Sequence, residues 1–116
     1  MFAVGDAVYI LDSGFKKSNT IRIIKRKFHS YENSQKTKIK TKIQVEDDDS
    51  YIFIHSWAVF PTIEDATRGA VAYLIYTLEF KKNINNDIDI HKLYSEFELR
   101  HPELIVKYLE KVTVHI

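Results

Sequence analysis

The chain has 116 residues, of which 45% are hydrophobic and 13% aromatic, so it has the material for one folded core and is too short for two independent ones. It contains no cysteine, which excludes disulfide scaffolds, thiolate metal sites and cysteine nucleophiles. The net charge is only +1, but residues 1–45 hold ten cations and three acids, a net of +7, whereas residues 46–116 hold seven cations and thirteen acids, a net of −6.

The first half of the chain is predicted to form β-strands. Residues 7–11 follow Gly5-Asp6 and end at a turn sequence. Residues 20–28 are rich in β-branched side chains, and the Ile23-Ile24 pair interrupts their alternation, which predicts a bulge or a bend. Residues 51–55 and a short segment at 57–60 are the last two predicted strands.

Residues 37–45 show the clearest alternation in the chain. Their apolar and threonine side chains fall on one side of a strand and their lysines on the other. With residues 51–55 this strand is predicted to form a long hairpin, and the acidic residues 46–49 form its tip.

The second half of the chain is predicted to be helical. Thr62 follows Pro61 and is the expected N-cap of a long helix, with Glu64 and Asp65 in its first turn. Its second half, residues 70–80, is apolar nearly all round, so it requires cover on more than one side. The C-terminal segment or a second subunit in a homodimer can supply that cover. A strand over residues 71–80 is the alternative.

Two shorter helices follow. Ile90, Leu93, Tyr94 and Phe97 have the spacing of one apolar helix face. The last helix is predicted to carry apolar positions from Leu104 to Val112, with Pro102 in its first turn.

These elements predict an α+β fold: a small β-barrel or strongly bent antiparallel sheet, followed by a long helix and two shorter C-terminal helices. One domain is expected over residues 1–116, with a basic, β-rich part at 1–60 and an acidic, helical part at 61–116. The N-terminus has no signal-peptide pattern. The longest mostly apolar stretch, residues 70–78, is shorter than the ~20 residues that cross a bilayer. A cytoplasmic protein with no membrane association is therefore expected.

The opening Val4-Gly5-Asp6-Ala7-Val8-Tyr9 resembles the first strand of small SH3-like barrels of the KOW and Tudor type. Residues 59–66, VFPTIEDA, resemble the exit from such a barrel into a helix in short uncharacterised phage and bacterial proteins. The resemblance covers about residues 3–75. It implies an SH3-like barrel and a binding role. Residues 20–28 depart from the KOW pattern, because they lack its glycine.

The main functional signal is a basic strand face, since lysines on alternate residues are about 6.6 Å apart and can follow a phosphate backbone. The preceding strand adds cations, and aromatic side chains beside it are candidates for base stacking. The predicted nucleic-acid-binding residues are Arg22, Lys25, Arg26, Phe28, Tyr31, Lys36, Lys38, Lys40 and Lys42. The competing interpretation is a solvated face whose lysines protect a sheet edge from aggregation.

No pattern indicates catalysis. The five histidines have no metal-ligand spacing, residues 46–49 lack the spaced ligands and glycine of a calcium loop, and no G-x-S-x-G elbow or phosphate-binding glycine loop is present. We therefore expect neither an enzyme nor a cofactor. The leading hypothesis is a regulatory protein that binds DNA or RNA with low sequence specificity. The alternative is a protein-binding adaptor or inhibitor, of phage origin and directed at a host protein.

Overall fold

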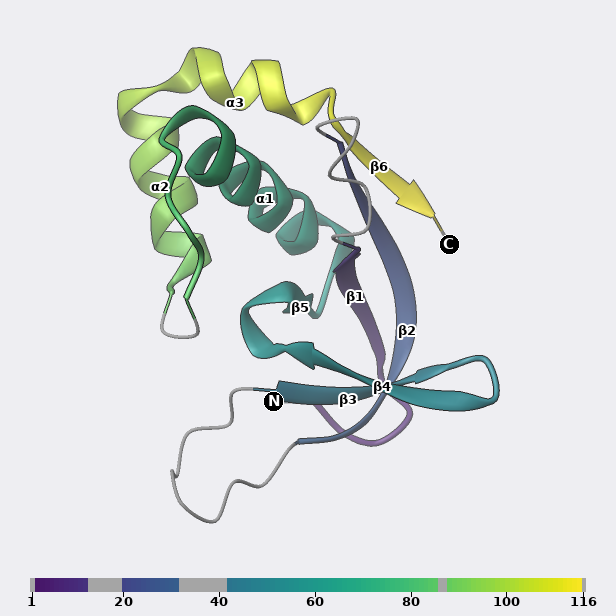
Figure 1. The fold of residues 1–116 in the computed structure, drawn as a ribbon. Coiled ribbons are helices and arrows are strands. Elements are labelled where there is room, and N and C mark those ends of the chain that lie inside the picture. The colour runs from purple at the N-terminus through teal and green to yellow at the C-terminus, as the bar shows by residue number, and fades with distance from the viewer. Residues whose placement is uncertain (1, 13–19, 32–41, 86–87, 116) are drawn as a thin grey trace.

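The computed structural model describes residues 2–12, 20–31, 42–85 and 88–115, and its fold is α+β (Figure 1). The strands are β1 (Ala7–Asp12), β2 (Ile21–Tyr31), β3 (Lys42–Asp47), β4 (Ser50–His55), β5 (Val59–Phe60) and β6 (Val112–His115). The helices are α1 (Ile63–Leu74), α2 (Ile90–Arg100) and α3 (Pro102–Leu109). A 3-10 turn (Ser56–Ala58) precedes β5, and a π-helical segment (Ile75–Glu79) continues α1.

The sheet has the strand order β4-β3-β2-β1-β5, with antiparallel neighbours. One edge of β2 pairs with β1. The other edge is shared, because β6 runs parallel to the first four residues of β2 and β3 pairs with its last four. Figure 1 shows β2 curving along its length from one partner to the other. Within the described chain the sheet is not closed: β4 and β5 stay at its two ends and do not pair.

The bulge in β2 is not at the predicted place. The register shifts between Phe28 and Ser30, whereas Ile23 and Ile24 lie in regular pairing with β1. Consecutive apolar residues occur there because both sides of the sheet are covered at that point. Ile23 packs in the cluster under the helices, and Ile24 packs against the cluster inside the bent sheet.

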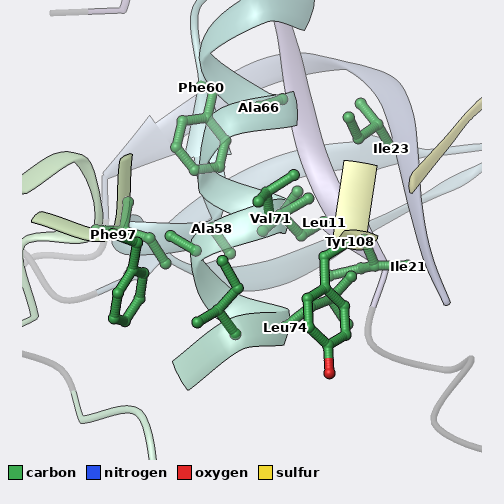
Figure 2. Packing of buried hydrophobic residues seen from close by; sticks show 14 residues of the cluster. Leu11, Ile21, Ile23, Ala58, Phe60, Ala66, Val71, Leu74, Phe97 and Tyr108 are labelled. Atoms are coloured by element: carbon green, nitrogen blue, oxygen red, sulfur yellow. The ribbon is translucent and has the colours of Figure 1, made fainter. Parts of the chain in front are cut away.

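The core has two parts. The first lies between the sheet and the helices and includes Ile23, Val71, Leu74 and Phe97 (Figure 2). The second lies on the inner side of the bent sheet and consists of Val8, Ile10, Phe28, Ile43, Val45 and Val59. The sheet is thus covered by α1 on one side and by its own bend on the other.

The start of α1 confirms the predicted N-cap, because the Thr62 Oγ1 accepts a hydrogen bond of 3.1 Å from the Asp65 amide. Residues 71–79 are helical and not a strand, with α1 ending at Leu74 and the π-helical segment at Glu79. Val71 and Ile75 are fully buried. Both α2 and α3 pack on α1, so one chain supplies the cover that this apolar helix requires.

The C-terminal prediction was partly wrong. The last helix ends at Leu109 instead of extending to Val112, and Val112 starts β6. Because β6 pairs with Ile21–Ile24, the end of the helical part is joined to β2, the strand that carries four of the ten cations in residues 1–45. No helix in the described part of the chain is long and apolar enough to cross a membrane.

Candidate nucleic-acid interface

Three of the predicted lysines, Lys36, Lys38 and Lys40, lie outside the described residues. The described end of that predicted strand keeps the expected alternation. Ile43 and Val45 are buried in the inner cluster, so Lys42 and Gln44 lie on the opposite side of β3, which faces away from it. We call this opposite side of β2, β3 and β4 the outer face.

The two predicted arginines lie on the inner side of β2. Arg22 forms a 2.6 Å ion pair with Asp12 on β1, and Arg26 forms a 3.3 Å ion pair with Asp47 on β3. Each guanidinium therefore already has a carboxylate partner. A phosphate would have to compete with that carboxylate, so both arginines are weaker candidates for phosphate contacts than the sequence suggests.

The predicted stacking residues are also on the inner side, and the prediction for Phe28 was wrong. Its ring is 3% exposed and packs against Phe2 and Tyr31, at centroid distances of 5.6 and 4.8 Å. Tyr31 is half-buried, and its hydroxyl accepts a hydrogen bond from the Phe2 amide at 2.9 Å. A base cannot stack on a ring that already fills the core.

The outer face carries three lysines of the described chain. Lys25 and Lys27 are exposed on β2, and Lys42 is half-exposed on β3. None of the three forms an ion pair with another described residue. Of the predicted site residues that the structure describes, Lys25 and Lys42 are therefore the two on the outer face, and Lys27 lies with them.

Aromatic side chains on β4 also lie on the outer face, and they were not among the predicted site residues. Tyr51 is 50% exposed and Phe53 is 54% exposed, and His55 follows at the same spacing. Their neighbours Ile52 and Ile54 pack against the inner cluster. The only sequence signal was the alternation in YIFIH, which shows two apolar faces and does not say which one is outside.

Ring contacts extend this aromatic surface in both directions. The His29 ring lies 4.3 Å from the Tyr51 ring. At the other end, His55 stacks on Trp57 at 6.4 Å, and Trp57 stacks on Tyr73 of α1 at 5.5 Å. Trp57 is half-buried between the sheet and α1, so its contacts hold the end of β4 against the helix.

Acidic residues limit the positive charge of the outer face. In the β3–β4 pairing Glu46 lies opposite Tyr51, Gln44 opposite Phe53 and Lys42 opposite His55. A pocket of about 290 Å³ opens beside Glu46, lined by Lys25, Arg26, Lys27, Glu46 and Asp48.

The described residues contain no cluster of three or more histidines and acids able to hold a metal ion.

This arrangement is suited to stacking and to phosphate contacts at once. Side chains on alternate strand residues stand about 6.7 Å apart, so the three β4 rings form a row. Such a row offers flat surfaces to successive unstacked bases, while lysines on the adjacent strands reach the backbone. A double helix keeps its bases stacked inside and cannot use the rings in this way.

No protein-family model matches this chain, and no curated protein or solved structure is significantly similar to it.

Proposed function

We propose that this protein binds single-stranded nucleic acid on its outer face and that it does so without catalysing a reaction. The observation that carries the proposal is the half-exposed pair Tyr51 and Phe53 on the same side of the sheet as three lysines that form no ion pair with another described residue. The contact of large aromatic rings with water is unfavourable, and covering these rings with stacked bases would remove apolar surface from water.

The lysines and the aromatic rings would contribute differently to binding. Lysine contacts to phosphates are independent of sequence and release counterions, so they supply affinity that falls with salt. Base stacking on an aromatic ring contributes about 1–3 kcal/mol per base and tolerates every base. The protein would therefore bind many sequences, as expected for a regulatory protein of low specificity.

The first test removes the rings. The Tyr51→Ala/Phe53→Ala variant should bind a single-stranded oligonucleotide at least about tenfold more weakly than the wild-type protein, because two stacking contacts are lost. The measurement is fluorescence anisotropy at fixed salt. The matched control is Leu99→Ala/Leu109→Ala, which removes two exposed apolar side chains from α2 and α3. Equal losses in both variants, or no loss in either, would contradict the proposal.

The second test removes charge. Lys25→Gln/Lys27→Gln should reduce the slope of log affinity against log salt by about 1.4, since each phosphate contact on a single strand contributes about 0.7. Lys92→Gln/Lys111→Gln makes the same charge change on exposed positions of the helical part and should leave the slope unchanged. An affinity of the wild-type protein that does not vary with salt would exclude the phosphate contacts.

We also infer that the bent sheet has the architecture of a small SH3-like barrel that is not closed. The support is the short β5, which returns after the 3-10 turn to pair with β1. With that pairing, five strands wrap one inner cluster, as the walls of a small barrel do.

The alternative function, binding of another protein, has one specific observation in its favour. The edge strand β4 has one partner among the described strands, β3, so its outer edge presents backbone groups to an extended peptide. Recovery of one defined protein by pull-down after nuclease treatment would favour this function. Recovery of nucleic-acid-associated proteins alone, lost on nuclease treatment, would count against it.

A further inference from the structure

We propose that the pocket beside Tyr51 selects guanine, with Glu46 and Lys27 as the residues that recognise it. This inference rests on the proposed function, because it assigns a base preference to the same outer face. Stacking by itself tolerates every base. The pocket supplies polar groups next to a stacking ring, and such groups distinguish one base from another.

The geometry places the two residues on adjacent strands. Arg26 pairs with Asp47, and Phe28 lies opposite Val45, so Lys27 lies across from Glu46 between these two contacts. Glu46 is in turn the cross-strand neighbour of Tyr51, and such neighbours have Cβ atoms about 4.5–5.5 Å apart. Glu46 lines the pocket and is the neighbour of Tyr51, so a base stacked on the exposed part of the Tyr51 ring would turn its edge toward the pocket.

Neither polar group is already engaged within the described chain. Glu46 and Lys27 form no ion pair or side-chain hydrogen bond with another described residue. By contrast, the neighbouring pair Arg26 and Asp47 is joined directly. The free carboxylate and the free ammonium line one pocket of about 290 Å³, and they offer acceptors and donors side by side.

Guanine has the pattern of groups that this pair complements. Its N1–H and its 2-amino group are adjacent donors, which one carboxylate can accept together, and its O6 accepts from an ammonium. Adenine and cytosine each offer the carboxylate one amino group beside an acceptor nitrogen. Uracil and thymine offer one imino N–H between two carbonyl oxygens, which the carboxylate repels.

The experiment compares oligonucleotides that differ at one base. The probes are thymidine strands of about 12 nucleotides with a central guanosine, inosine or adenosine, and affinity is measured by anisotropy at one salt concentration. Inosine lacks only the 2-amino group. The wild-type protein should bind the guanosine strand about tenfold more tightly than the other two, the value expected for one good bidentate contact.

The variant Glu46→Gln tests the assigned residue. Removing a negative charge also relieves the general repulsion of every strand by the same amount, so the readout is the ratio of affinities for the guanosine and inosine strands. This ratio should fall toward one in Glu46→Gln and stay unchanged in Glu110→Gln, which neutralises an exposed carboxylate after α3. The inosine comparison in the wild-type protein needs no variant, so a folding defect in Glu46→Gln leaves the test intact.

Two results would overturn the inference, and they are distinguishable. Tight, salt-dependent binding with equal affinities for all three strands would leave the proposed function in place and remove the guanine site. No binding of the wild-type protein to any strand at low salt would remove both.

Discussion

Position 69 has no room for a side chain, because the ring of Phe60 fills the space next to Gly69. A Cβ atom built on Gly69 would lie 2.3 Å from the Phe60 Cζ, closer than any real contact. Phe60 is itself 2% exposed. This glycine therefore lets α1 approach β5, and its small size matters more here than its backbone freedom.

Gly69→Ala should lower the free energy of unfolding. Overpacking a core typically costs about 1–3 kcal/mol, which exceeds the roughly 1 kcal/mol that alanine gains over glycine in a helix. Urea denaturation would measure the difference. Phe60→Leu shortens the obstructing ring, so a double-mutant cycle should give a favourable coupling between the two substitutions. A Gly69→Ala variant as stable as the wild type would show that displacing the ring costs no more than the helical gain from alanine, which would contradict the overpacking.

At the scale of elements, Glu79 fastens α3 to the end of the π-helical segment. Its Oε1 accepts hydrogen bonds from the Lys107 Nζ at 2.7 Å and from the Tyr108 hydroxyl at 2.8 Å. The hydrogen bond from Lys107, and then that from Tyr108, lower the pKa of Glu79 below its ordinary value of 4.5. The ionised carboxylate is therefore the form that the folded protein favours.

The contribution of these two Glu79 hydrogen bonds to stability should decrease in acid. Because the pKa of Glu79 is lower in the folded than in the unfolded chain, its contribution to stability is present above pH 4.5 and is lost as the pH falls through the folded-state pKa. The wild type should therefore be more stable than Glu79→Gln at pH 7, and this advantage should shrink below pH 4.5. Urea denaturation over a pH series would measure it. Glu110→Gln is the control, and a pH-independent difference from Glu79→Gln would contradict the assignment.

At the scale of the whole molecule, the basic β-rich part and the acidic helical part share one core. The cluster between sheet and helices draws Leu11 and Ile23 from the strands, Val71 from α1 and Tyr108 from α3. The parallel pairing of β6 with β2 adds a backbone connection between the two parts. Neither part can keep its buried surface if the other unfolds.

Unfolding should accordingly be a single transition. Trp57 stacks on Tyr73 and so reports on the contact between the sheet and α1, while far-UV circular dichroism reports mainly on the helices. The two signals should give the same urea midpoint, as two-state behaviour requires. Loss of the Trp57 signal before the helical signal would show that the helical part is stable without the sheet.

Local sequence patterns predicted much of the fold and little of the site. The Thr62 cap, the amphipathic spacing of α2 and the outward side of Lys42 follow from interactions within a few residues, and the structure has all three. The exposed aromatic row on β4 was not among the predicted site residues, because Tyr51 and Phe53 alternate with Ile52 and Ile54. Both sides of that strand are apolar, so its periodicity does not identify the exposed side.

The sequence by itself determined the α+β class, the placement of the first five strands before the helices and the concentration of positive charge in the first half, because propensity, capping and charge are local properties of the chain. Only the tertiary structure decided that Arg22 and Arg26 face inward to carboxylates while Lys25 and Lys27 face outward. It also made residues 112–115 a strand beside β2. These outcomes depend on which distant strand lies next to each residue. The pairing of the strands is in turn determined by the burial of both hydrophobic clusters, whose residues come from distant parts of the sequence.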